Sequence, residues 1–418
     1  MHNKVKAIFV GNVHPKQMEP ISLAFDVEYY ENGFEVVHFP SDKNIVHDLY
    51  GHSDFDVIVT FADMSSSNES DWWEWCQKMW PTLSSLGRTV IDKWIVVDRR
   101  ISPEDLGEQI LNKFFNNARN YRTYPGMVSI TTPCYKTKRE WFFRMYESLK
   151  NQTYQNWEWV ILDDSGESSK LIESYLDEIR DFRIRSVKNL THRGNVGYNK
   201  RVLGMMAQGE YILELDHDDE LTHDCLEHVV SAFEAYPDAG FVYSEALELL
   251  GDNLACLFEN GWAWGQGKQS QDTFMGFQYN ITPDINSVSI RTLMACPNHV
   301  RVWRKTVYDK INGHNHNFSI VDDFEIMVRT FLVSKFCYIP KVLYIQHREH
   351  ETTQVSRNAE IQRCNLLVKE LYDYRIHERI LELGEEDLVW DDTRECSDIQ
   401  IEELLNQKFN YVYEPEKI

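Results

Sequence analysis

From Met127 onward the chain repeats one pattern, in which a short apolar run is followed by a polar loop and then by apolar residues at helical spacing. Strands and amphipathic helices in this order bury their apolar surfaces best when the helices cover a mostly parallel sheet. The expected strands are VSITT, WEWVIL, RIRSV, EYILEL and GFVYSEA. The pattern predicts an open α/β sheet with four loops beyond the carboxyl ends of its strands, the edge at which such sheets bind ligands.

Helices are expected between these strands because apolar residues recur there every three to four positions. The first helix begins near Lys138, and its apolar face consists of Trp141, Phe142, Met145 and Leu149. The second covers residues 171–179, and a third follows the loop 192–197. Thr222 is placed to cap a fourth helix.

Residues 1–120 show a weaker form of the same alternation. Their expected strands are KAIFVG, FEVVHF, FDVIVTF and KWIVVD, which predict a small parallel α/β layer. A helix is expected at residues 106–115, and four tryptophans between positions 72 and 80 indicate a buried or partner-facing helix. The polar stretch 116–126 is the expected boundary. The expected domains are an α/β accessory domain at 1–120, the main α/β domain at 125–356 and a helical, acidic extension with a polar tail at 357–418.

The charge balance of the 418 residues excludes several classes of function. Asp and Glu number 66 against 43 Lys and Arg, so the net charge of −23 opposes broad binding to nucleic acid or to anionic lipid. No apolar run approaches the ~18 residues that span a bilayer, and no secretion signal is evident. The eight cysteines contain no CxxC pair, which indicates reduced thiols. We therefore expect a cytoplasmic protein.

The sharpest local feature follows the strand EYILEL, where LDHDDE places four carboxylates within five positions. Carboxylates this close repel one another, and a bound cation offsets that repulsion. Ligation by oxygen alone favours Mg²⁺ or Mn²⁺, which keep open positions for nucleotide phosphates. The alternative is a solvated acidic turn near a helix start. A calcium loop is excluded because its glycine and its distal glutamate are absent. The four carboxylates belong to Asp216, Asp218, Asp219 and Glu220.

The order of these segments resembles that of the family 2 glycosyltransferases of the GT-A type, over residues 127–350. The resemblance rests on VSITTPCY, a strand ending in DDSG, the loop RGNVG and then GEYILELDHDD. It implies that Asp163 or Asp164 contacts a nucleotide base and that Asp216 and Asp218 hold the ribose and a metal-bound diphosphate. The positions expected to contact the nucleotide are Thr132, Pro133, Tyr135, Asp163, Asp164, Gly197, Asn199 and Asp216.

Two later motifs extend the resemblance. FSIVDDFEIMVR resembles the family's acidic pair followed by a helix ending in arginine, and YIQHREH resembles its closing arginine-x-histidine. They imply that Asp322 and Asp323 are the catalytic pair and that His350 joins Asp216 and Asp218 as a metal ligand. We expect Asp323 to be the general base, a lone desolvated carboxylate at the start of a buried helix. The pair here is Asp-Asp where the family usually has Glu-Asp.

The resemblance implies a metal-dependent glycosyltransferase. A UDP-sugar is the favoured donor, Mn²⁺ or Mg²⁺ the cofactor, and a hydroxyl of a carbohydrate or other molecule the acceptor. With one base and no second nucleophilic carboxylate, a single displacement with inversion is the simplest scheme. One rival is a nucleotidyltransferase, although TTPCYKTK lacks the glycines expected of its signature. Another is an inactive subunit that binds sugar nucleotides or a partner. Residues 1–120 have three open roles, namely acceptor binding, self-association or a degenerate nucleotide fold.

Two further features do not have the spacing of a metal site or a phosphate site. Histidines at 299, 314, 316 and 347 lack the tight spacing of a transition-metal site, so we expect them to face solvent or to be hydrogen-bonded. GWAWGQGKQSQ lacks the spacing of a phosphate-binding P-loop. Its Trp262 and Trp264 belong either to a loop beside the site that stacks on an acceptor or to a loop pinned to the surface.

Overall fold

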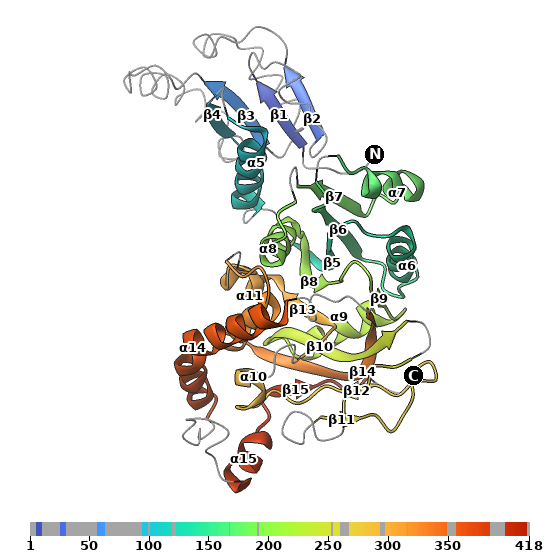
Figure 1. Cartoon of the computed structure of the whole chain (residues 1–418), viewed down its shortest axis with the longest axis vertical. Coiled ribbons are helices and arrows are strands. Elements are labelled where there is room, and N and C mark those ends of the chain that lie inside the picture. The colour runs from blue at the N-terminus through green and yellow to red at the C-terminus, as the bar shows by residue number, and fades with distance from the viewer. Residues whose placement is uncertain are drawn as a thin grey trace. The chain divides into compact units, whose positions relative to one another are not determined.

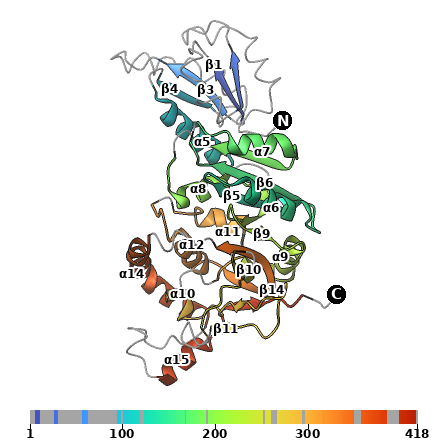
Figure 2. The ribbon, with the colours of Figure 1, turned by 45° about the vertical axis from the view of Figure 1, so that its right-hand side comes forward.

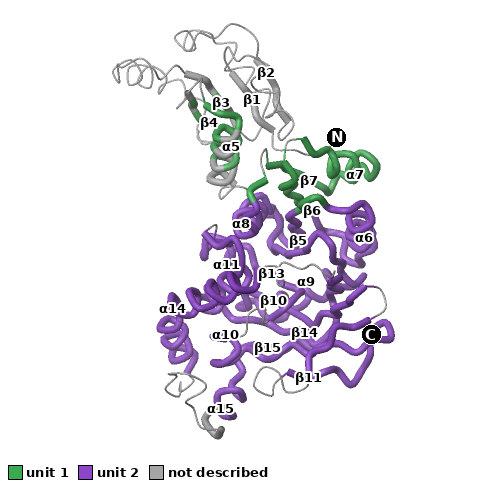
Figure 3. The backbone as a smooth tube through the Cα atoms, in the orientation of Figure 1, with its two compact units in different colours: residues 1–122, 134–136, 160–193 green, residues 123–133, 137–159, 194–418 purple. Residues whose placement is uncertain are grey.

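The computed structural model divides the chain into two compact units, which are coloured separately in Figure 3. Unit 1 comprises residues 1–122, 134–136 and 160–193, and unit 2 comprises residues 123–133, 137–159 and 194–418. The residues that the structure describes are 6–10, 26–30, 57–62, 94–98, 101–118, 123–166, 168–189, 192–251, 254–259, 267–292, 297–315, 317–348, 357–384 and 398–415. The expected strand FEVVHF, the tryptophans at 72–80 and the loop with Trp262 and Trp264 lie outside these residues.

Unit 1 contains a parallel sheet with the strand order β2-β1-β3-β4. Its strands are β1 (Lys6–Val10), β2 (Asp26–Tyr30), β3 (Val57–Ala62) and β4 (Trp94–Asp98). All three pairings are parallel, which confirms the small parallel layer expected from the sequence. β2 was missed because Asp26 and Glu28 interrupt its apolar residues.

Helices and later strands complete unit 1. Helix α5 (Pro103–Ala118) contacts β3 and β4 and buries Leu106, Ile110 and Leu111, which repeat at helical spacing. Strand β6 (Trp157–Asp163) enters unit 1 at Val160. Helix α7 and strand β7 follow it, and both were expected from the sequence. Their bounds are Leu171–Ile179 for α7 and Ile184–Lys188 for β7.

Unit 2 is built on a mixed sheet with the strand order β11-β12-β10-β13-β8-β5. β5 and β8 run parallel, β13 lies antiparallel between β8 and β10, and β14 runs parallel to β10 (Figure 1). The strands are β5 (Tyr124–Cys134), β8 (Gly209–Glu214), β9 (Glu220–Leu221), β10 (Ala239–Leu250), β11 (Lys268–Gln269), β12 (Asn280–Ile281), β13 (Arg301–Arg304), β14 (Lys335–Arg348) and β15 (Asn410–Val412). The α/β class expected from the sequence is confirmed.

The helices of unit 2 include those expected near Lys138, after the 192–197 loop and at the acidic pair. Their bounds are α6 (Arg139–Lys150), α8 (Val196–Met206), α9 (Cys225–Ala235), α10 (Ser289–Thr292), α11 (Lys305–Lys310), α12 (Asp322–Phe331), α14 (Asn358–Glu382) and α15 (Asp398–Leu405). The expectation that Thr222 caps α9 is wrong, because Asp224 is the N-cap residue and the Thr222 hydroxyl donates to Asp224 Oδ1 at 2.9 Å. None of the described helices is both long and apolar enough to cross a bilayer.

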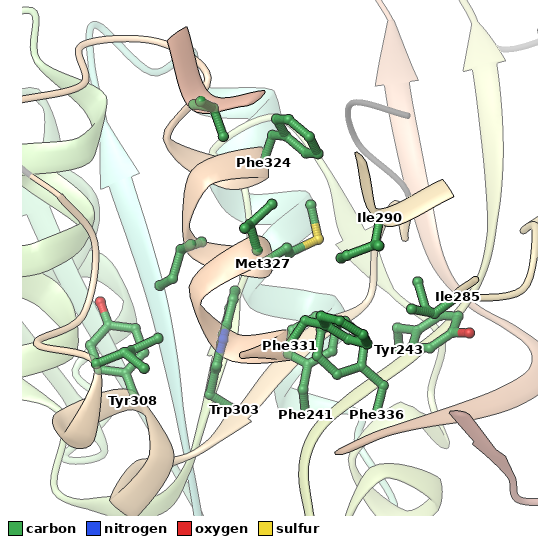
Figure 4. Packing of buried hydrophobic residues seen from close by; sticks show 14 of the residues in the cluster. Phe241, Tyr243, Ile285, Ile290, Trp303, Tyr308, Phe324, Met327, Phe331 and Phe336 are labelled. Carbon is green, nitrogen blue, oxygen red and sulfur yellow. The ribbon is translucent and has the colours of Figure 1, made fainter. Parts of the chain in front are cut away.

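The core of unit 2 lies where α12 packs on the sheet. Phe331 of α12 contacts Phe336 of β14, whose ring packs on Phe241 of β10, and Trp303 of β13 lies against Phe241 (Figure 4). The buried Trp303 indole donates a hydrogen bond to Thr330 Oγ1 at 2.9 Å. These contacts fix α12, and hence the acidic pair at its start, against the sheet.

The C-terminal segment covers α12 and then returns to the sheet. α14 lies beside α12 (Figure 2), and Tyr372 of α14 donates a hydrogen bond to Glu325 Oε1 at 2.8 Å. The helical extension expected after residue 357 is therefore present. Within the expected polar tail, β15 pairs in parallel with β14 and Tyr411 stacks on Tyr236.

Glu245 is an unusual buried acid in the middle of β10. The register between β10 and β14 shifts on both sides of it, which marks a bulge. Its Oε2 accepts hydrogen bonds from the backbone N–H and the hydroxyl of Thr282 at 2.8 and 3.0 Å, and its Oε1 contacts the Tyr338 hydroxyl. Burial outweighs these bonds and raises the pKa of Glu245 to about 7.

This raised pKa predicts a pH-dependent loss of stability. Below its unfolded-state pKa the carboxyl is protonated in both states, whereas near pH 8 the folded state must bury a charge. Replacing Glu245 with Gln removes that charge, so the variant should gain roughly 3 kcal/mol relative to wild type as pH rises from about 4.5 to about 8. Urea unfolding at both pH values measures the gain. A difference between the proteins that stays constant with pH would contradict the prediction.

Candidate active site

The four carboxylates of the LDHDDE turn do not share one site. Asp219 is 1% exposed, and it accepts hydrogen bonds from the Tyr344 hydroxyl and from the backbone N–H of His347, both at 2.7 Å. Oε1 of Glu220 lies 2.9 Å from Nε2 of His347. The last two carboxylates of the turn are thus bound to β14, while the first two remain partly exposed.

Those first two carboxylates, of Asp216 and Asp218, suit a hard divalent cation. Burial raises the pKa of Asp218, and repulsion from Asp216 adds to the rise, which a cation beside both groups would reverse. Mg²⁺ at nucleotide sites needs only one or two carboxylates, because phosphates and waters complete its coordination. Within the described residues no group of three or more His, Cys, Asp or Glu side chains has the arrangement of a metal site, and His350 lies outside them. The donor set therefore fits a cation whose other ligands come from a phosphate.

His299 packs beside Asp216. Its Nε2 lies 3.6 Å from Asp216 Oδ2, and its ring stacks on Tyr344 at 4.3 Å between centroids. Burial lowers the pKa of His299 to about 4. Burial also works to raise the pKa of Asp216, but the charge of Lys200 is the largest opposing cause and the pKa is lowered. Asp216 is therefore ionised and His299 neutral near pH 7.

A buried charge network joins β8, α8 and β13. Glu214 ends β8, and its Oε2 lies 3.4 Å from Lys200 Nζ and 3.8 Å from Arg301 Nη1. All three side chains are buried. Burial opposes ionisation of Glu214, yet Lys200 and then His314 lower its pKa, and Glu214 in turn raises that of Lys200. Each charge is tolerated in the interior because the others are present.

His314 and Asp322 extend this network toward α12. His314 Nε2 lies 2.7 Å from Glu214 Oε1, and His314 Nδ1 is hydrogen-bonded to the Tyr308 hydroxyl at 2.9 Å. The scattered histidines were expected either to face solvent or to be hydrogen-bonded, and His314 is hydrogen-bonded. Asp322, with 7% of its side chain exposed, lies 3.8 Å from both Lys200 Nζ and His314 Nε2. Burial raises the pKa of Asp322.

Asp323 is the more exposed member of the acidic pair, at 30% of its side chain. The expectation of a lone carboxylate is wrong, because Arg301 Nη2 lies 3.2 Å from Asp323 Oδ2. The other oxygen, Oδ1, accepts the backbone N–H of Phe324 at 2.8 Å. Burial would raise the pKa of Asp323, but Arg301 and Lys200 outweigh it and lower the pKa. The pair does begin a buried helix, as the sequence predicts.

Gly197 and Asn199, two of the expected nucleotide contacts, lie in the first turns of α8. A Cβ on Gly197 would lie 2.4 Å from the carbonyl oxygen of Phe318 and 2.7 Å from that of Asn315. Glycine is thus required by close packing against the loop that leads to α12. Asn199 is buried. The close packing at Gly197 helps to hold α8 in the position from which Lys200 reaches Glu214.

Unit 1 holds the residues expected at the nucleotide base. Oδ1 of the buried Asp164 accepts hydrogen bonds from Asn189 Nδ2 at 2.7 Å and from the Arg193 N–H at 3.0 Å, and its Oδ2 lies 3.1 Å from His192 Nδ1. The His192 ring stacks on Tyr135 at 4.1 Å between centroids, and both rings are exposed. The buried carboxylate thus holds a loop that presents an exposed aromatic surface.

The remaining expected contacts are strand-end residues. Asp163 is buried in unit 1, its Oδ1 accepts the Ser165 N–H at 3.0 Å, and burial raises its pKa. Thr132 is buried in unit 2 and accepts a hydrogen bond from the Trp159 indole at 2.9 Å. Pro133, near the end of β5, is partly exposed. Because the side chains of Asp163 and Thr132 are hydrogen-bonded, both polar groups can be buried without an unpaired acceptor.

Several residues of the charge network were missed in the sequence. Glu214 and Arg301 each interrupt an apolar strand, in YILEL and VRVW, and a single charge inside such a run is the signal that was available. Lys200 was passed over because only its neighbours matched an expected motif. A buried charge inside a strand requires a partner elsewhere in the chain.

The network predicts that two arginines of β13 contribute differently to the free energy of unfolding. Arg301→Met removes the cation that pairs with Asp323 and one of the two that lie beside Glu214, so it should lower the free energy of unfolding by ~3–5 kcal/mol. Arg304 is the matched control, since it also lies on β13 and pairs with Glu210 at 3.0 Å, but it is partly exposed. Arg304→Met should cost ~1–2 kcal/mol. If urea unfolding shows equal losses for the two variants, the buried network contributes no more to stability than the partly exposed pair does.

Part of the chain is similar to known proteins. Residues 129–247 match the profile of a family described as Glycosyl transferase family 2. An uncharacterized glycosyltransferase of Haemophilus influenzae is 31% identical over 29% of this chain and 39% of its own length. The chondroitin synthase of Escherichia coli is 24% identical over 57% of this chain and 31% of its own length. The chain thus spans less than half of each of these relatives.

Solved structures with a similar course of the chain include TarS residues 1–349 of S. aureus in complex with UDP-GlcNAc. That structure is 14% identical, with a TM-score of 0.45 over 61% of this chain and 73% of the other. The profile match covers the acidic turn and the strands that lead to it, in the order described above. On this match, residues 129–247 form a glycosyltransferase family 2 domain.

Proposed function

We propose that this chain transfers a sugar from a nucleotide sugar to an acceptor hydroxyl. The observation that carries the proposal is that Asp216, Asp218 and Asp323 stay partly exposed while the carboxylates next to them are bound by other parts of the protein. Two groups suit a metal-bound diphosphate and one suits a proton acceptor. The family match supports the reaction class. A cytoplasmic location, acceptor binding or self-association by residues 1–120, and the metal ligand His350 stay predictions.

The donor is proposed to be a UDP-sugar. Tyr135 and one of Asp163 and Asp164 are its proposed base contacts, as the family resemblance implies. Thr132, Pro133, Gly197 and Asn199 keep their proposed place beside the nucleotide, acting through backbone and packing where their side chains are buried. Exposed aromatic rings such as that of Tyr135 suit stacking on a flat base.

Asp216 and Asp218 are proposed to hold Mn²⁺ or Mg²⁺. When bound, the cation would neutralise charge on the departing diphosphate. Asp216 is poised for this role because Lys200 keeps its carboxylate ionised. Asp218 is less readily ionised alone, so its ligation should be coupled to arrival of the cation.

Asp323 is proposed to accept the proton of the acceptor hydroxyl. Its lowered pKa keeps the carboxylate ionised near pH 7, and Arg301 with the Phe324 N–H fixes its orientation. An oriented base contributes typically ~10²–10⁴-fold to the rate. With this one base, a single displacement that inverts the anomeric centre is the simplest scheme.

The metal role predicts metal-dependent nucleotide binding that requires Asp218. UDP at ~100 times its dissociation constant should stabilise the wild type by ~2.7 kcal/mol in the presence of Mn²⁺ and much less without it. Asp218→Asn should abolish this thermal shift, because it removes a ligand charge at unchanged side-chain volume. The metal-free variant should be at least as stable as wild type, since repulsion with Asp216 is relieved.

The control for this experiment is Asp238→Asn, which removes an exposed charge from the loop between α9 and β10. It should keep the full response to UDP and Mn²⁺. A wild type indifferent to every nucleoside diphosphate would refute the proposed function. If Asp218→Asn responds normally, the LDHDDE segment is a solvated acidic turn and not a metal site.

The base role predicts a selective loss of turnover in Asp323→Asn. Transfer should fall at least ~100-fold while donor affinity changes little, because the lost interaction belongs to the transition state. Initial rates with a UDP-sugar, together with UDP affinity, measure both quantities.

Asp224→Asn is the matched control, because Asp224 also stands at a helix start and also pairs with a cation, Lys341 Nζ, at 2.5 Å. It should change stability without changing turnover per folded enzyme. If Asp323→Asn keeps near-normal transfer, or loses donor binding and turnover together, Asp323 is not the base.

A further inference from the structure

The acidic turn is held along one side by α6 and the residues that flank it. These contacts lie within unit 2 and join residues 137–153 to residues 217–226. The hydrogen-bonded pairs include Thr137 with His217, Arg144 with the Asp218 carbonyl, Ser148 with the Leu221 N–H, Gln152 with the Thr222 carbonyl, Gln152 with the Leu226 N–H and the Thr153 N–H with the His223 carbonyl. The turn is thus fixed as a unit on α6.

His217 occupies the central position of the turn, between the two proposed metal ligands. Its Nδ1 is hydrogen-bonded to Thr137 Oγ1 at 2.9 Å. Trp141 meets the His217 ring edge-on, at 5.7 Å between centroids and 80° between planes. The Trp141 ring is in turn covered by Lys138 Nζ at 4.1 Å. Thr137 is 1% exposed, so its hydroxyl is a rigid partner for the imidazole.

The opposite side of the turn is fixed by β14. The Tyr344 hydroxyl accepts the Asp216 N–H at 3.1 Å and donates to Asp219. The Asp219 N–H donates a hydrogen bond to the Asp216 carbonyl at 3.3 Å. Between these two flanks, the imidazole of His217 is held by its hydrogen bond to Thr137 and by its edge-on contact with Trp141.

We propose that Thr137 is a positioning residue for the metal site and acts through His217. The hydrogen bond between them holds the His217 backbone so that the carboxylates of Asp216 and Asp218 converge on one cation. Residues that orient metal ligands from behind typically contribute 10–100-fold to metal affinity. This inference rests on the proposed function, because it presumes that the two carboxylates bind a cation.

The test is a titration of the full-length protein with Mn²⁺ at a fixed UDP concentration, with free Mn²⁺ followed by electron paramagnetic resonance. Thr137→Val keeps the volume but removes the hydroxyl, so Mn²⁺ affinity should fall at least ~10-fold. Thr137→Ser keeps the hydroxyl and should bind Mn²⁺ within about threefold of wild type. Thr153→Val is the matched control, since the Thr153 hydroxyl bonds Glu227 at 2.6 Å away from the acidic turn, and it should bind as wild type does.

A second pair of variants tests the route through His217. His217→Phe keeps a ring without the bonding nitrogen and should match the loss in Thr137→Val, and His217→Asn should restore part of it. The double variant Thr137→Val with His217→Phe should lose no more than either single variant, because both remove one hydrogen bond. If Thr137→Val does not fold, the His217 pair decides alone.

The outcomes separate this inference from the proposed function. Wild type that binds Mn²⁺ with UDP, together with Thr137→Val or His217→Phe of unchanged affinity, overturns the positioning role and leaves the proposed function standing. Wild type that binds no Mn²⁺ overturns both. Additive losses in the double variant also overturn it, because they would mean that the two side chains act independently.

Discussion

The fold around the site depends on pairing charges that the interior would otherwise reject. Glu214, Lys200 and Arg301 come from β8, α8 and β13, and each is buried. A buried charge without its partner costs several kcal/mol, so these three elements are stable only in the one arrangement that brings the charges together. Since Arg301 also binds Asp323, the same arrangement sets where α12 begins. A stability requirement in the core thereby fixes the geometry of the proposed base.

Pairing also sorts the acidic residues of the site into two groups. Asp219 accepts hydrogen bonds from Tyr344 and His347, and Asp322 lies close to Lys200 and His314. The carboxylates left partly exposed are those proposed to meet the cation and the acceptor. Residues adjacent in sequence thus have different surroundings, because consecutive side chains at a turn or a helix start point in different directions.

The sequence predicted the elements where local periodicity is strong, and it failed where the decisive interaction is distant in the chain. β6, α7 and β8 are apolar at strand or helical spacing and were expected nearly to the residue. The polar strand β15 exists because β14 offers it an edge, which no local pattern reveals. The candidate site was located by its carboxylates, but the partner of Asp323 was not, because Arg301 is 22 positions away and its burial depends on the folded sheet.

The charge balance of the buried network gives a reason why a divalent cation would assist the proposed reaction. Lys200 and Arg301 face three carboxylates, of Glu214, Asp322 and Asp323, and the ionised Asp216 lies beside them. Carboxylates therefore outnumber these two cations, and a diphosphate arriving alone would be repelled. In the proposed reaction Asp216 and Asp218 would hold a divalent ion, whose charge would offset that of the departing diphosphate, while Arg301 keeps Asp323 ionised. The network thus favours cation binding and base ionisation together, and a substitution that neutralised its acidic members would weaken the first even where it left the fold intact.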